Sequence, residues 1–409
     1  MAALTVMRYD FDTPVNRRRD DAVKWAVPEG ALPMWIADMD FPAAPEILDA
    51  LQSRLDHGVF GYGDIPAAWY DAYIGWWRTR HGFTMERDWL IFCTGVVPAI
   101  SSIVRKLTTP NENVLLLTPV YNIFFNSTLN NGCRALECPL LYEKGAYAID
   151  WEDFERKLSD PQTTLFILCN PHNPVGKIWD AETLARIGAL CRKHHVTVIS
   201  DEIHCDLTAP GKGYVPFLSV SDDCRAVGIA CIAPTKAFNL AGMQTAAVAV
   251  PDPVLRHKVW RGLNTDEVAE PNAFAVPAAV AAFTKGAPWL DALREYIFDN
   301  RTLVCETLEK SLPAVHVVQG EATYLLWLDV SELAPDSRAL CRHLEASTGL
   351  YLAAGEVYGK AGQGFLRMNV ACPRAMVLDG LQRLIEGVRT YAPIKPKAAG
   401  RKCNRKNDC

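Results

Sequence analysis

The sequence lacks the long apolar segments that mark membrane and secreted proteins. No run approaches the ~20 continuous apolar residues that a membrane-spanning helix requires. The N-terminal stretch MAALTVMRYDFDTPVNRRRD also contains no apolar core of a signal peptide. We therefore expect no association with a membrane and a cytoplasmic location.

An excess of charge of either sign is missing as well. The formal net charge is −5 at pH 7, which gives the chain no electrostatic reason to bind nucleic acid. The 409 residues are 49% hydrophobic and 22% charged. A chain of this length and composition is long enough to form two globular domains.

Metal-ligand spacings are the third absence. The chain has 13 cysteines, an odd number, scattered singly and without a CxxC or HExxH pattern. His204 and Cys205 are adjacent, and adjacent residues of a strand point to opposite faces. We expect buried free thiols in a reducing compartment and no metal site.

Four continuous apolar runs, each followed at once by polar or turn-forming residues, dominate the first two thirds of the chain. They are 114–117, 164–169, 196–200 and 226–232. Such runs are typical of strands covered on both faces. Helical patterns such as 181–193 lie between them, which predicts a mostly parallel sheet flanked by helices. Ligands bind beyond the carboxyl edge of such a sheet, where all four polar segments would meet.

The pattern changes beyond residue 286. A long helix is expected from Trp289 to about Leu312, followed by an alternating strand at 323–329 and another strand at 365–370. The prediction is an α/β protein with a large domain at 46–286 and a smaller α+β domain built from 1–45 and 287–393. Residues 394–409 are basic and lack apolar periodicity, which predicts a disordered tail.

A lysine, an aspartate and an asparagine at one sheet edge suit pyridoxal phosphate. This cofactor needs an amine for its aldehyde, an acid for its ring nitrogen and a hydrogen bond to its phenolic oxygen. It also needs an aromatic face and amide donors for its phosphate. The candidates, in that order, are Lys236, Asp201, Asn173, Tyr121 and the loop Thr94–Val97, which precedes an expected helix at 96–107.

These residues stand in motifs that resemble fold-type I pyridoxal-phosphate enzymes of the aminotransferase class I/II superfamily. Within them, the sequence is similar to the MalY/PatB-type carbon–sulfur β-lyases. The motifs occur in family order and are Pro33–Phe41, Phe60–Gly63, Thr94–Pro98, Thr118–Tyr121, Asn170–Gly176, Ser200–His204, Ala233–Lys236 and Phe365–Asn369. The resemblance implies an aspartate-aminotransferase-like fold.

The resemblance also implies residue roles. Lys236 would bind the cofactor covalently and then carry the Cα proton, Asp201 would keep the ring nitrogen protonated, and Arg367 would bind the substrate carboxylate. The remaining implied contacts are Asn173 to the phenolic oxygen and the substrate, Tyr121 stacked on the ring, Gly95, Val96, Val97 and Thr235 at the phosphate, Ile36 and Ala37 over the substrate, and Tyr62 reaching the neighbouring subunit of a homodimer.

The sequence departs from the family pattern beside the lysine. Thr235 and Ala237 stand where the family usually has serine and threonine, and Gln244 stands where many aminotransferases have a phosphate-binding arginine. For His204, a role near the cofactor and a structural role both stay open. Taken alone, Asp201 also suits a helix N-cap, and Tyr121 suits a core position.

The implied reaction is α,β-elimination of L-cystathionine or a related cysteine S-conjugate to a thiol, pyruvate and ammonia. Two alternatives stay open: an aminotransferase that uses the same residues, and a lyase with an added regulatory role in protein binding. A dinucleotide-binding enzyme is not expected, because no G-x-G-x-x-G follows a strand and opens a helix. The preferred thioether is not determined by these patterns.

Overall fold

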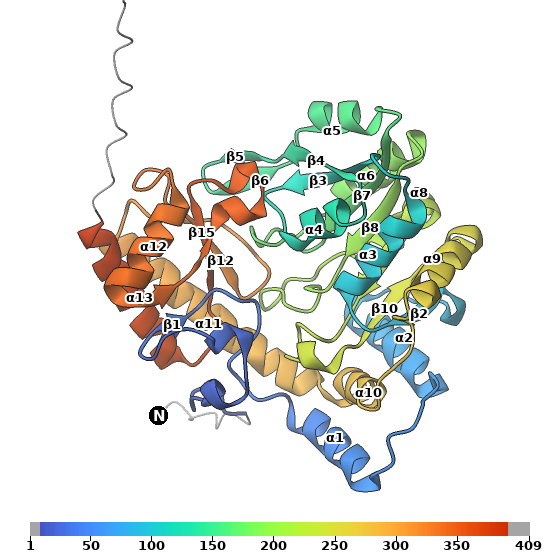
Figure 1. Ribbon diagram of the computed structural model, residues 1–409, viewed down its shortest axis with the longest axis horizontal. Helices are drawn as coiled ribbons and strands as arrows, with labels where there is room; N and C mark the ends of the chain where they lie inside the picture. The colour runs from blue at the N-terminus through green and yellow to red at the C-terminus, as the bar shows by residue number, and fades with distance from the viewer. Residues whose placement is uncertain (1–8, 392–409) are drawn as a thin grey trace, which may run out of the picture.

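The computed structural model describes residues 9–391 and places their helices around two sheets (Figure 1). The large sheet has seven strands in the order β2-β10-β9-β8-β7-β3-β4. Their bounds are β2 Leu90–Cys93, β3 Asn113–Thr118, β4 Arg134–Pro139, β7 Thr163–Cys169, β8 Thr197–Asp201, β9 Gly228–Ile232 and β10 Ala246–Ala249. Strands β4, β3, β7, β8 and β9 pair in parallel, and β10 runs antiparallel to β9 and β2. The predicted mostly parallel sheet is confirmed.

Helices cover both faces of this sheet, as continuous apolar strands require. Apolar side chains of α3 and α9 pack on one face, and those of α2, α5, α6, α8 and α10 pack on the other. The helices of this part of the chain are α1 Pro45–His57, α2 Ala67–His81, α3 Val96–Leu107, α4 Ile123–Leu129, α5 Trp151–Leu158, α6 Ala181–Lys193, α7 Phe217–Val220, α8 Asp222–Val227, α9 Pro253–Thr265 and α10 Ala275–Lys285. Helices α3 and α6 have the bounds that the sequence predicts.

The second sheet is antiparallel, in the order β11-β12-β15-β14. Its strands are β11 His316–Val317, β12 Leu325–Asp329, β14 Ala353–Ala354 and β15 Phe365–Asn369, and its helices are α11 Ala287–Ser311, α12 Ser337–Thr348 and α13 Arg374–Thr390. Two further pairs are β1 Leu32–Pro33 with β13 Leu350–Tyr351, which are parallel, and the hairpin β5 Leu141–Glu143 with β6 Ala146–Ala148. The β1–β13 pair joins the N-terminal segment to the part of the chain that directly precedes β14 of the second sheet. The predicted domain boundaries stay a prediction, and the tail at 394–409 lies outside the described residues.

Two local predictions were wrong. The strand expected at 226–232 begins at Gly228, because Ala226 and Val227 form the last turn of α8, whose first turn is capped by the Ser221 side chain. The strand expected to alternate at 323–329 is buried at every position of β12. Leu326 and Leu328 pack against the helices of the second sheet, while the opposite face of β12 joins the main core.

Candidate active site

Lys236 lies in the loop that follows β9, at the carboxyl edge of the large sheet. Its Nζ atom donates a hydrogen bond to the carbonyl oxygen of Ala37 at 2.5 Å. Burial lowers the pKa of Lys236 to about 8, and the charge of Arg367 lowers it too, against the opposing effect of Asp38 and Asp201. A lysine with this pKa is available as a neutral amine near neutral pH, which a nucleophile or a base requires.

Asp201 is the last residue of β8, beside Cys231 of β9. Its buried carboxylate accepts a hydrogen bond from the backbone N–H of Ile203 at 3.1 Å. Burial raises the pKa of Asp201 to about 7, although the Ile203 hydrogen bond and the charge of Lys236 act in the other direction. A cationic N–H donor in the adjoining cavity would restore the ionised form.

A cavity of about 300 Å³ lies between these two side chains and the start of α3. It brings together ten of the predicted site residues: Ala37, Gly95, Val96, Val97, Tyr121, Asn173, Asp201, His204, Thr235 and Lys236. Thr94, Pro98, Cys169, Ile203, Ala241 and Gln244 complete its lining. The polar segments that follow separate strands therefore meet at one edge of the sheet, as expected.

Arg367 adjoins this cavity from the middle of β15. One Nη atom donates to Oδ1 of Asn173 at 3.3 Å, and the other donates to the carbonyl of Trp35 at 2.8 Å. The guanidinium group also lies 4.9 Å from the ring centre of Tyr358. Its Nε atom is buried and has no hydrogen-bond partner among the described residues. These contacts hold a planar cation beside the cavity, in a setting suited to a carboxylate.

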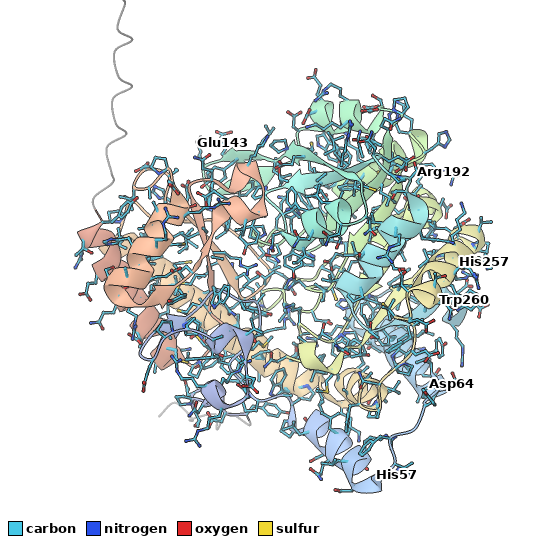
Figure 2. All side chains as sticks on the ribbon, in the orientation of Figure 1. His57, Asp64, Glu143, Arg192, His257 and Trp260 are labelled. Carbon is cyan, nitrogen blue, oxygen red and sulfur yellow. The ribbon has the colours of Figure 1, made fainter. Side chains whose placement is uncertain are left out.

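Besides Arg367, two predicted site residues do not line the cavity. Ile36 contributes its carbonyl, which accepts a hydrogen bond from Asn369 at 2.6 Å. Tyr62 is fully exposed, in the segment between α1 and α2, and Figure 2 shows that His57 and Asp64 on either side of it lie at the edge of the molecule. Tyr62 therefore does not reach the cavity of its own chain, and its predicted role in a neighbouring subunit stays a prediction.

His204 lines the cavity as a neutral side chain. Burial lowers its pKa to about 3, and the charges of Lys236 and Arg367 add to the effect. Its Nδ1 atom is buried and has no hydrogen-bond partner within residues 9–391. The ring centre lies 6.2 Å from that of Tyr324. A polar nitrogen without a partner in a cavity wall fits a hydrogen bond to a bound group.

The chemistry of this cavity fits pyridoxal phosphate. Lys236 offers the amine, Asp201 offers a buried carboxyl that a cationic N–H group would ionise, and Tyr121 offers an aromatic face. The first N–H groups of α3 have no partner within their helix and suit a phosphate. A side chain at Gly95 would crowd the first turn of α3, since a Cβ atom there would lie 3.1 Å from Cδ of Pro98.

Two asparagines near the cavity were missed by the sequence analysis. The Tyr324 hydroxyl donates to the carbonyl of Ala37 at 3.0 Å, and Asn239 and Asn369 donate to neighbouring carbonyls of the same segment. Both asparagines follow predicted site residues closely, three positions after Lys236 and two after Arg367. Their closeness in sequence to predicted site residues is the signal that could have identified these two asparagines.

Other features of the described residues lie apart from this chemistry. Two larger cavities, of about 570 and 810 Å³, lie along α11 and the β5–β6 hairpin and do not include Lys236. His81, Cys205 and Asp206 have ligand-type atoms within 4.8 Å of one another, although the sequence shows no metal-ligand spacing. The Asp206 carboxylate already accepts hydrogen bonds from Trp76 and His81. None of the helices in the described part of the chain is both long and apolar enough to cross a bilayer.

Comparison with known proteins gives consistent matches over nearly the whole chain. The model of the family described as aminotransferase class I and II matches residues 34–384. Cystathionine beta-lyase PatB of Bacillus subtilis (strain 168) is 43% identical over 381 residues, 92% of this chain and 98% of that protein. Protein MalY of Escherichia coli (strain K12) is 31% identical, over 93% of this chain and 99% of that protein. The crystal structure of cystalysin from Treponema denticola, which contains pyridoxal 5'-phosphate, has a TM-score of 0.91 at 30% identity and covers 94% of this chain and 99% of its own.

Proposed function

We propose that this chain, which belongs to the aminotransferase class I and II family and within it to the MalY/PatB-type carbon–sulfur β-lyases, acts on L-cystathionine or a related cysteine S-conjugate. It is a pyridoxal-phosphate-dependent β-lyase, as its relatives are. The proposed products are a thiol, pyruvate and ammonia. The observation that carries the proposal is the cavity lined by Lys236, Asp201 and Asn173, with Arg367 hydrogen-bonded to Asn173 beside it.

In this proposal, Lys236 binds the cofactor and also moves the proton of the reaction. When bound, pyridoxal phosphate supplies an electron sink for the charge that develops at the substrate Cα. The neutral Nζ of Lys236 takes the Cα proton, and the Cβ–S bond breaks with its electron pair leaving on sulfur. The lowered pKa supports the role of base, because a protonated lysine cannot accept a proton.

Arg367 and Asn173 orient the substrate. The guanidinium group binds the α-carboxylate with two parallel hydrogen bonds, and the Asn173 amide contacts both the substrate and the phenolic oxygen of the cofactor. The existing contact of Arg367 Nη1 with Asn173 supports a shared task, since it places both groups side by side. Asp201 keeps a proton on the ring nitrogen. Its buried carboxyl lines the cavity, and a cationic N–H group beside it would lower its pKa and favour the ionised form.

The active unit is proposed to be a homodimer in the cytoplasm. Full exposure of the Tyr62 side chain supports a contact with the second subunit. The free cysteines of the described residues support a reducing compartment. The domain division is proposed to be 46–286 for cofactor binding, with 1–45 and 287–393 as the smaller domain.

A coupled assay tests the proposed function. Purified holoenzyme given L-cystathionine, with no keto acid added, should release pyruvate and free thiol in equal amounts. An aminotransferase would need an amino-group acceptor, so pyruvate that appears only after a keto acid is added would contradict the lyase. S-methylcysteine and other cysteine S-conjugates, assayed in parallel, would rank the thioethers.

The pH dependence of cofactor uptake tests the assignment of Lys236. The rate at which cofactor-free protein takes up pyridoxal phosphate should rise with pH and level off above about 8, since the neutral amine is the nucleophile. Stopped-flow absorbance would give the midpoint. A midpoint near 10.4, the value of an exposed lysine, would contradict the buried amine. Arg367→Met should move the midpoint upward, because the guanidinium charge lowers this pKa.

A further inference from the structure

The segment Trp35–Met39, here called the rim segment, crosses the active site outside any sheet. Each of its five carbonyl groups accepts a hydrogen bond from a side chain. The donors are Arg367 to Trp35 at 2.8 Å, Asn369 to Ile36 at 2.6 Å, Lys236 and Tyr324 to Ala37 at 2.5 and 3.0 Å, Asn369 and Lys24 to Asp38 at 2.6 and 3.4 Å, and Arg17 and Asn239 to Met39 at 3.1 Å each. Side chains of the site therefore fix this backbone, in place of strand pairing.

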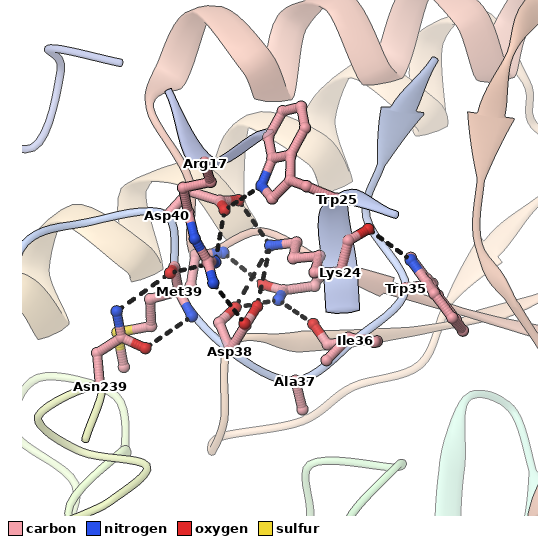
Figure 3. A network of polar contacts seen from close by, with 12 residues as sticks. Arg17, Lys24, Trp25, Trp35, Ile36, Ala37, Asp38, Met39, Asp40 and Asn239 are labelled. Atoms are coloured by element: carbon pink, nitrogen blue, oxygen red, sulfur yellow. Dashed lines mark hydrogen bonds and ion pairs between the residues drawn. The ribbon is translucent and has the colours of Figure 1, made fainter. Parts of the chain in front are cut away.

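An ion network lies behind the rim segment (Figure 3). Lys24 and Asp40 are both buried, and Nζ of Lys24 lies 2.6 Å from Oδ2 of Asp40. Arg17 contacts Asp40 and Asp38 with separate Nη atoms, each at 3.0 Å. Trp25 donates its indole N–H to Oδ1 of Asp40 at 2.8 Å. Burying such charges costs free energy even when they are paired, so stability alone is a weak reason for this network.

The network and the active site contact the same short backbone segment. The side chains of Asp38 and Asp40 point toward Arg17 and Lys24 (Figure 3). The carbonyl of Ala37 accepts a hydrogen bond from the amine of Lys236. A base must be held at a defined position to take a proton, and an error of 1 Å can cost about 100-fold in rate. The carbonyl of Ala37 is the acceptor that the structure provides for the free amine.

We propose that Lys24 and Asp40 are positioning residues: their buried pair fixes the rim segment so that the carbonyl of Ala37 orients the free amine of Lys236 for proton removal. This inference rests on the proposed function for its catalytic consequence. The anchoring itself depends only on the contacts between the network and the rim segment.

Three variants and one control test the inference in the holoenzyme. Asp40→Asn and Lys24→Met each break the pair, and the double variant Lys24→Met/Asp40→Asn removes both charges so that neither is left buried alone. Arg18→Met is the matched control. Arg18 lies in the same N-terminal stretch, donates to the carbonyls of Val27, Pro28 and Ala31, and lies over the ring of Trp25 at 5.2 Å. Within the described residues, its side chain makes no hydrogen bond or ion pair with the rim segment, Lys24 or Asp40, so Arg18→Met disturbs the same region and leaves the buried pair intact.

The first measurement is the kinetic isotope effect on elimination of a Cα-deuterated cysteine S-conjugate. The pair variants should lower kcat by about 10- to 100-fold and increase the isotope effect on kcat, because proton removal becomes slower relative to the other steps. A smaller folded fraction would lower kcat without changing the isotope effect. Arg18→Met should keep the wild-type isotope effect.

The second measurement is amide hydrogen exchange in peptides that cover residues 33–41. Faster exchange in the pair variants, with Arg18→Met unchanged, is the expected result. This readout needs no turnover, so it stands even if the wild type fails to eliminate thiol. Unchanged exchange and an unchanged isotope effect in the double variant would overturn the proposal, as would equal effects in Arg18→Met.

Discussion

Replacement of Lys236 by alanine should lower thiol release from cysteine S-conjugates by about 10³-fold or more. The variant loses both the covalent attachment of the cofactor and the base that takes the Cα proton, and a positioned base alone contributes about 10²- to 10⁴-fold. The side chain of Lys236 accounts for both losses because its amine, with a pKa of about 8, lies in the cavity beside Asp201. The visible absorbance of the covalently bound cofactor should disappear together with activity.

Lys236→Arg separates the charge of this side chain from its basicity. Arginine keeps a cation in the cavity but cannot be deprotonated in a protein, so this variant should be as inactive as Lys236→Ala. A small amine such as ethylamine should restore part of the activity to the alanine variant, where space has been opened, and none to the arginine variant. Substantial activity in Lys236→Ala without added amine would show that another group removes the proton.

The large sheet and most of the cavity could be predicted from the sequence, because both depend on local patterns. Continuous apolar runs predict buried strands, and parallel strands deliver the residues that follow them to one edge. Asp201 and Lys236 follow neighbouring strands, so their meeting in one cavity could be expected from their positions in the chain. The resemblance then added roles for residues such as Tyr121 that a pattern alone would leave in the core.

Contacts between distant segments could not be predicted in the same way. The ion pair of Lys24 and Asp40 and the hydrogen bonds of Asn369 depend on how the N-terminal segment lies against β15. A charged residue in a short irregular segment gives no periodic signal, and its usual place is the protein surface. The complete burial of β12 could not be predicted for the same reason, since one of its faces is covered by segments that are far away in the sequence.

Asp201→Asn should lower elimination by about 10²- to 10⁴-fold while leaving the cofactor covalently bound to Lys236. Asparagine keeps the size of the side chain but removes the negative charge that would hold a proton on the ring nitrogen. Steady-state thiol release and the visible spectrum of the holoenzyme would separate the two properties. Loss of the bound cofactor in this variant would contradict the assignment of Asp201 to proton retention.

Glu202→Gln is the matched control for Asp201→Asn. The neighbouring Glu202 is also buried, and burial raises its pKa to about 7 as well. Its carboxylate faces away from the cavity and accepts hydrogen bonds from Ser200, Tyr214 and the backbone of Phe217. Its replacement should leave turnover per folded molecule within about twofold of wild type, because the side chain does not contact the reacting groups. Equal loss of turnover in both variants would mean that buried charge in general, and not the position of Asp201, supports the reaction.

Asp201→Asn should stabilise the cofactor-free protein near neutral pH, although the same change lowers activity. Because the folded pKa of Asp201 is about 7, above its ordinary value of 3.8, this group contributes stability at low pH that is lost as pH rises through 7. Removing the carboxylate should therefore stabilise the cofactor-free chain at pH 8 relative to wild type, on the order of a few kcal/mol, and much less at pH 4. Urea unfolding at the two pH values measures the difference. If Asp201 destabilises the cofactor-free fold at pH 8 and is also required for turnover, its place in the site is explained by its chemistry. Equal stability of wild type and Asp201→Asn at pH 8 would contradict this explanation.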